Sequence, residues 1–115
     1  MKAKKILWVD DEIDLLRSHM IFLEGKGYGM KGVSSGEEAV RVLSREPFDL
    51  VLLDETMPGK TGLETLQEIK EISANIPVIM ITKNEAEGLM DQAIGMKIDD
   101  YLLKPINPLQ ILSLI

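Results

Sequence analysis

The sequence has no cysteine, so it offers neither a disulfide framework nor thiol chemistry. It also lacks any apolar stretch near the roughly 20 residues that a transmembrane helix needs. The apolar run behind the basic N-terminus stops at Asp10, too early for a signal peptide. We therefore expect a cytoplasmic protein without a membrane partner.

Positive charge is scarce as well, since 13 Lys and Arg stand against 19 Asp and Glu and give a formal net charge of −6. That balance disfavours direct binding to nucleic acid and indicates proteins or cations as partners. The length of 115 residues and the hydrophobic content of 45% fit one domain, residues 1–115, with one core. A last helix ending at Ile115 would fall short of the usual three turns, so we expect this helix to be truncated and the domain to be excised from a longer protein.

Short apolar runs alternate with segments of helical spacing along the whole chain. Strands are expected at Ile6–Val9, Met30–Val33, Leu50–Leu53, Val78–Ile81 and Tyr101–Leu103. Helical spacing of apolar residues covers Leu15–Leu23, Ala39–Leu43, Leu63–Ile72 and Leu89–Ile94, and a last helix would begin at Pro108 behind the N-cap Asn107. The alternation predicts an α/β domain with five parallel strands and five helices.

Polar residues stand at the ends of these strands, and in a parallel sheet such positions gather along one edge. They are Asp10, Asp11, Asp54, Thr82 and Lys104. Three carboxylates this close repel one another unless a cation lies between them, which indicates a hard divalent ion such as Mg²⁺. Lys104 is suited to bind a phosphoryl group that a metal and a carboxylate hold from the other side.

Several fragments carry these residues in a fixed order. They are Lys5-Ile-Leu-Trp-Val-Asp10-Asp11-Glu12, Asp49-Leu-Val-Leu-Leu-Asp54 followed by Met57-Pro58-Gly59 and Gly62, Ile79-Met-Ile-Thr82, and Asp100-Tyr101-Leu-Leu-Lys104-Pro105. Together they resemble the receiver domain of two-component response regulators, the CheY-like superfamily, over essentially the whole chain. The resemblance implies a single (βα)5 doubly wound domain with the flavodoxin-like strand order 2-1-3-4-5.

The same resemblance implies a role for each residue. Asp54 would be the phosphoacceptor, taking a phosphoryl group from a sensor histidine kinase or a phosphotransfer protein. Asp11 would bind Mg²⁺ directly and Asp10 largely through water, with Asp54 and the backbone carbonyl of Thr56 as further ligands; Mn²⁺ could substitute. Thr82 and Lys104 would bind phosphoryl oxygens during the transfer.

Switching and output follow from the resemblance too. Tyr101 would turn inward once Thr82 moves toward the phosphoryl group, and the Lys104–Pro105 bond is cis in this family. The domain would signal rather than act as an enzyme, catalysing only its own phosphotransfer and autodephosphorylation. It would control an output domain or a partner, and it could form a homodimer through the fourth helix, fifth strand and fifth helix.

Some positions depart from the usual receiver pattern. Lys83 follows Thr82 where a small residue is common, so Lys83, like Pro105 behind Lys104, is a candidate modulator of the site. Lys97-Ile98 replaces the usual Gly-Ala, and Thr61 stands where Asp is frequent. The choice of residues around Asp54, Lys83 and Lys104 is similar to that in PorX-like regulators of Bacteroidetes, in which a PglZ-type output domain follows.

Other functions remain open at this stage. A degenerate receiver would act through protein contacts without phosphorylation, and Lys83 is its best support. A haloacid-dehalogenase-type hydrolase would need an acidic residue at position 56, where Thr56 stands. Outside the site, Trp8 is expected in the core, and we interpret His19 as a helix-surface residue rather than a functional one.

Overall fold

A computed structural model of the chain describes residues 4–55, 57–83, 98 and 100–115. Its strands are β1 (Lys5–Val9), β2 (Gly29–Val33), β3 (Leu50–Asp54), β4 (Val78–Thr82) and β5 (Asp100–Leu103). Its helices are the 3-10 turn η1 (Ile13–Leu16), α1 (Arg17–Gly25), α2 (Gly36–Leu43), α3 (Gly62–Ile72) and α5 (Pro108–Leu114). The helix expected over Leu89–Ile94 lies outside the described residues.

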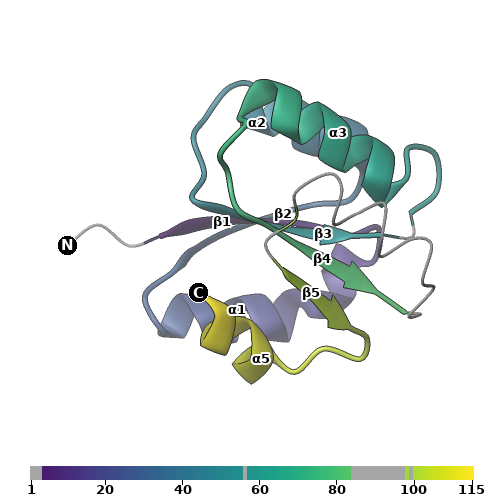
Figure 1. Cartoon of the computed structure of the whole chain (residues 1–115). Helices are drawn as coiled ribbons and strands as arrows, with labels where there is room; N and C mark the ends of the chain where they lie inside the picture. Colours follow the sequence, from purple (N-terminus) through teal and green to yellow (C-terminus); the bar gives the residue numbers. More distant parts are fainter. Residues whose placement is uncertain (1–3, 56, 84–97, 99) are drawn as a thin grey trace.

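All five strands form one parallel sheet in the order β2-β1-β3-β4-β5, which confirms the predicted topology. In Figure 1, α1 and α5 lie on one face of the sheet and α2 and α3 on the other. The sheet is therefore covered on both sides, as parallel sheets require.

Alternating side chains of each strand serve the two layers, because successive residues of a strand point to opposite faces. On β1, Ile6 and Trp8 pack in the cluster that contains Leu23 of α1, whereas Leu7 and Val9 pack in the opposite cluster. These four side chains of β1 are fully buried, and Trp8 is thus a core residue as expected. This arrangement fixes the direction in which the chain leaves β1 at Asp10.

Polar N-cap residues mark the starts of α2 and α5. The Ser35 hydroxyl accepts a hydrogen bond from the Glu38 amide, which caps α2. Asn107 and Gln110 form a capping box at the start of α5, with Pro108 in its first turn. The predicted N-cap Asn107 and first helical residue Pro108 are confirmed. At both helices the side-chain caps satisfy amides that the helix itself leaves unpaired.

The first helical segment differs from the expected single helix. The Leu15 amide bonds the Glu12 carbonyl three residues back, which is the hydrogen-bond pattern of a 3-10 turn. The α-helix proper begins only at Arg17. The tighter turn arises where the chain leaves β1, since the Ile13 amide is held by the Asp10 carbonyl.

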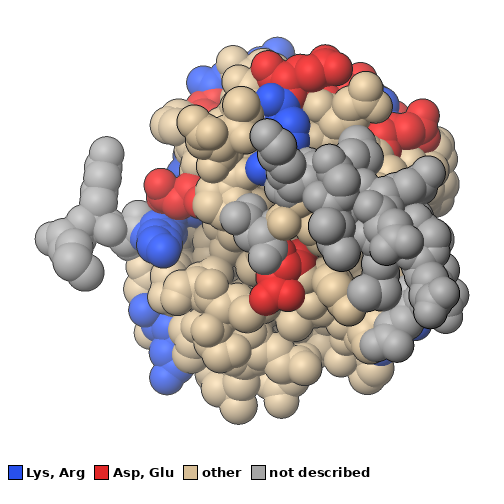
Figure 2. Space-filling model, in the orientation of Figure 1, with Lys and Arg blue, Asp and Glu red and all other residues tan. Residues whose placement is uncertain are grey.

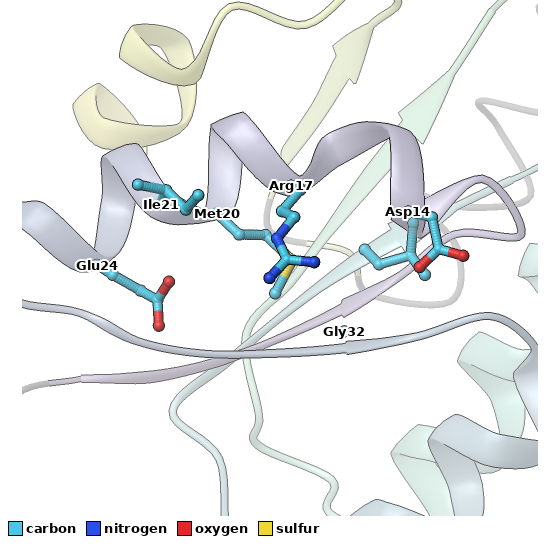
Figure 3. Close-up of a pocket in the computed structure, with 7 residues that line it drawn as sticks. Asp14, Arg17, Met20, Ile21, Glu24 and Gly32 are labelled. Carbon is cyan, nitrogen blue, oxygen red and sulfur yellow. The ribbon is translucent and has the colours of Figure 1, made fainter.

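An open pocket of about 430 Å³ is lined by residues of η1, α1 and the edge strand β2 (Figure 3). Gly32 forms part of its wall, and a Cβ atom there would lie 2.5 Å from Ile13 Cγ1. The missing side chain at Gly32 therefore leaves room for the Ile13 side chain of η1 to pack against β2. Side chains of Asp14, Arg17 and Glu24 stand along the same pocket.

Charged side chains of both signs are interspersed over the α2 and α3 layer, whereas the region over α1 and α5 is largely uncharged in the view of Figure 2. On α5 the exposed apolar residues are Leu109 and Leu114, which are 57% and 39% exposed. In the described part of the chain, no helix combines the length and apolar character needed to cross a membrane.

Candidate functional site

The carboxyl edge of the sheet brings together two buried carboxylates and one lysine. Asp10 directly follows β1, Asp54 is the last residue of β3, and Lys104 directly follows β5. The Lys104 Nζ lies 3.4 Å from Asp10 Oδ2 and 3.3 Å from Asp54 Oδ2. Both aspartates are 1% exposed, so a single partly buried ammonium is shared between two carboxylates that are shielded from water.

Backbone contacts fix the Asp10 carboxylate on one side. Its Oδ1 accepts a hydrogen bond of 2.8 Å from the Glu12 amide, and its own amide donates to the Val33 carbonyl. Oδ2 is thereby directed to Lys104. Asp10 is thus held by β2, by the following turn and by Lys104, which leaves its side chain little freedom.

Lys104 has a raised pKa. Burial alone would lower it, but the negative charges of Asp54 and Asp10, with their hydrogen bonds to the ammonium, outweigh that effect. The lysine backbone is also anchored, because its amide donates to the Thr82 carbonyl at 2.8 Å. Lys104 therefore remains a cation at neutral pH and is attached to the end of β4.

An acidic group surrounds the outer part of this edge. Oxygen atoms of Asp10, Asp11 and Glu12 all lie within 4.8 Å of one another, and Asp11 and Glu12 are exposed. Oxygen donors are what Mg²⁺ requires, and it retains several waters when only a few carboxylates are available. The donor set fits a Mg²⁺ ion. The predicted ligand Thr56 lies outside the described residues.

A close approach at Gly62 positions the chain behind Asp54. A Cβ atom at Gly62 would lie 2.6 Å from the Asp54 carbonyl oxygen and 2.5 Å from the Glu55 Cα. The Gly62 amide donates to the Glu55 carbonyl at 3.0 Å. The start of α3 is thus packed directly onto the backbone of the candidate phosphoacceptor, and only glycine leaves room for it.

Among the other predicted residues, Thr82 and Lys83 lie at the edge, whereas Tyr101 pairs with Met80 within the sheet. Thr82 ends β4 and is 4% exposed. Tyr101 is half-buried against the α2 and α3 layer. Lys83 is exposed and, with Lys104 and Pro105, lines a cleft of about 470 Å³ that Trp8 and Asp10 also border. The Lys104–Pro105 peptide bond is cis, as the resemblance implied.

Solved structures share this architecture. Vibrio cholerae chemotaxis protein CheY4 is 25% identical, with a TM-score of 0.90 over 97% of this chain and 95% of its own. A CheY-like response regulator receiver domain protein from Methanospirillum hungatei is 29% identical, with a TM-score of 0.91 over 96% and 89%. The fold and the acidic edge thus define a CheY-like receiver.

Sequence comparisons agree. The family model described as the response regulator receiver domain matches residues 6–115. The transcriptional regulatory protein ResD of Bacillus subtilis is 36% identical over 93% of this chain and 44% of its own length. A CpxR homolog of Haemophilus influenzae is 38% identical over 95% and 47%. The chain belongs to the response regulator receiver domain family and spans about half the length of these relatives.

Sequence reasoning overlooked two features of the site and misjudged a third residue. Glu12 joins the acidic group, although it was not among the expected ligands. Gly62 was noted as part of a motif, but its contact with the Asp54 backbone depends on tertiary packing. His19 is half-buried rather than a plain surface residue, because its Nε2 lies 2.7 Å from the Ile106 carbonyl oxygen.

Proposed function

We propose that this receiver domain accepts a phosphoryl group on Asp54 from a phosphohistidine of a sensor histidine kinase or a phosphotransfer protein. The observation that carries the proposal is the Lys104 ammonium shared by the buried carboxylates of Asp10 and Asp54. The ion pair places the positively charged Lys104 ammonium beside an oxygen of Asp54, the proposed nucleophile. In the alternative of a degenerate receiver, the same ammonium would serve only to neutralise the two buried carboxylates.

The transfer needs little from the protein beyond position and charge. A carboxylate oxygen of Asp54 forms a bond to phosphorus as the bond from phosphorus to the imidazole nitrogen breaks, and the electron pair stays on that nitrogen. Lys104 can then turn to an oxygen of the phosphoryl group. The Thr82 hydroxyl is the second donor proposed for this group, and Tyr101 is the proposed switch that responds to it.

Asp10, Asp11 and Glu12 would hold Mg²⁺, with Asp54 and the Thr56 carbonyl as the further proposed ligands. When bound, the ion neutralises charge on the phosphoryl oxygens. A receiver domain of a Pseudomonas aeruginosa sensor histidine kinase, 26% identical with a TM-score of 0.82, has been solved with magnesium coordinated in its active site cleft. That likeness supports the same ion here.

We further propose a cytoplasmic setting and a longer protein in which this domain, residues 1–115, controls an output domain. The PglZ-type output of PorX-like regulators is the candidate suggested by the sequence. The exposed Leu109 and Leu114 on α5 support a dimer that uses α5 and β5, together with the helix expected over Leu89–Ile94.

Intact-mass measurement after incubation with acetyl phosphate and Mg²⁺ tests the proposed function. We expect one phosphoryl adduct that is lost on hydroxylamine treatment, as acyl phosphates are, and no adduct when EDTA replaces Mg²⁺. An unmodified mass with both acetyl phosphate and phosphoramidate would contradict the proposal. Multiple turnover of phosphomonoesters would indicate a hydrolase instead.

Added Mg²⁺ should stabilise the folded domain. A ligand that binds only the folded state contributes about 2.7 kcal/mol at 100 times its dissociation constant, so the melting temperature should rise by several degrees. Trp8, two residues before Asp10, gives a fluorescence readout of the same titration. Asp11→Asn should remove most of the effect, whereas the matched change Asp14→Asn, outside the acidic group, should keep it. Identical melting curves with and without Mg²⁺, Mn²⁺ and Ca²⁺ would exclude the metal site.

Lys83→Ala should speed both labelling by acetyl phosphate and loss of the phosphoryl group, on the order of threefold. The Lys83 side chain lines the cleft next to Lys104, so it can obstruct the approach of a donor or of water. Rates from mass spectrometry check this, with Lys31→Ala on β2 as the control. Slower labelling would instead show that the Lys83 charge attracts the donor.

A further inference from the structure

Near Lys104, the side chain of His19 makes a hydrogen bond that has no role in the proposed function. The His19 Nε2 of α1 lies 2.7 Å from the carbonyl oxygen of Ile106, two residues beyond Lys104. A carbonyl oxygen only accepts hydrogen bonds, so Nε2 carries the proton and donates it. This bond connects α1 to the loop between β5 and α5, two segments far apart in the sequence.

The same imidazole contacts the strand that carries Asp10. The rings of His19 and Trp8 meet edge to face, with centroids 6.0 Å apart and an interplanar angle of 83°. Trp8 is fully buried and lies two residues before Asp10. His19 therefore supports both partners of the ion pair, Asp10 through β1 and Lys104 through the loop.

Among the described residues, the His19 Nδ1 is buried without a hydrogen-bond partner, so the bond to Ile106 is the one polar anchor of this ring. The loop it holds is short. The Lys104 amide is tied to the Thr82 carbonyl on one side, and Pro105 fixes one backbone torsion between Lys104 and Ile106. A shift of the Ile106 carbonyl is thus transmitted to Lys104 with few intervening degrees of freedom.

We propose that His19 is a positioning residue for Lys104, acting through the Ile106 carbonyl. The inference rests on the proposed function, in which Lys104 binds the phosphoryl group. His19 touches neither the phosphoryl group nor the carboxylates. It keeps the loop placed so that the Lys104 ammonium lies between Asp10 and Asp54.

Two substitutions separate the hydrogen bond from the bulk of the side chain. His19→Leu fills similar space but has no donor, whereas His19→Gln offers an amide N–H near the position of Nε2. With acetyl phosphate and Mg²⁺ we expect His19→Leu to label on the order of fivefold to tenfold more slowly, and His19→Gln to restore most of the rate. Leu23→Val, which removes a buried methylene from the same helix, controls for lost stability and should label as wild type does.

A double-mutant cycle with Lys104→Ala distinguishes positioning from a general structural role. If His19 acts through Lys104, then His19→Leu should slow labelling no further once Lys104 is Ala, although the melting temperature still falls. Hydrogen exchange of the Lys104 amide should be faster in His19→Leu and close to the wild-type rate in His19→Gln.

Wild-type labelling by His19→Leu, or an equal slowing in the Lys104→Ala background, would overturn the inference alone. A wild-type chain that takes no phosphoryl group at all would overturn the proposed function and this inference with it. The two failures are therefore distinguishable in one set of measurements.

Discussion

Asp54→Asn should eliminate the phosphoryl adduct entirely, because an amide of the same shape is a far poorer nucleophile than a carboxylate. Asp54 is 1% exposed and shares the Lys104 ammonium with Asp10, so the variant leaves Lys104 paired with Asp10 alone. That remaining pair is neutral, and we expect the melting temperature without metal to be unchanged or higher. Intact mass after acetyl phosphate treatment and thermal unfolding check both statements.

The matched control for Asp54→Asn is Asp49→Asn. Asp49 is exposed and directly precedes β3, so this variant should be labelled normally. An adduct of normal yield on the Asp54→Asn protein, mapped by peptide analysis to another residue, would remove Asp54 from its proposed role. Asp54→Asn should also weaken the stabilisation by Mg²⁺, since it removes one of the proposed ligands.

Gly62→Ala should produce a large loss of stability. The new Cβ would be placed 2.6 Å from the Asp54 carbonyl oxygen and 2.5 Å from the Glu55 Cα, both backbone atoms that cannot rotate away. Overpacking of this kind costs about 3 kcal/mol, which corresponds to a fall in melting temperature on the order of 10 °C. Chemical denaturation provides the free energy of unfolding.

Gly25→Ala is the control for Gly62→Ala, because a Cβ there meets nothing within 4 Å and the residue ends α1. The control should be neutral or slightly stabilising, as alanine is favoured over glycine in helices. If Gly62→Ala unfolds at the wild-type denaturant concentration, the close packing of α3 on the Asp54 backbone is not required.

Strand positions and order were predictable because apolar runs such as Leu50–Leu53 are too short for helices, and because the motifs resemble one family. The edge residues Asp10, Asp54 and Lys104 were predictable for the same reason, since chain direction alone brings strand ends together. The 3-10 turn η1 was not, because its hydrogen bonds depend on the exit of the chain from β1 rather than on apolar spacing.

Contacts between segments that are distant in the chain could not be predicted from a single sequence. His19 and Ile106 are separated by 87 positions, and nothing in either neighbourhood signals that they meet. The clash that makes Gly62 necessary likewise exists only after α3 has packed on β3. In both cases tertiary packing, rather than local propensity, gives the residue its importance.

Lys104 is the one cation that pairs with both Asp10 and Asp54 among the described residues, so a change of charge at Asp54 also affects Asp10. Converting the Asp54 carboxylate to an acyl phosphate adds about one negative charge, since a phosphoryl group carries close to two. In the proposed transfer, Lys104 turns from Asp10 to the phosphoryl oxygens, and Asp10 Oδ2, which it now faces at 3.4 Å, would lose its counter-ion. We therefore expect phosphorylation and divalent cation binding to be thermodynamically coupled, so that each strengthens the other by the same factor.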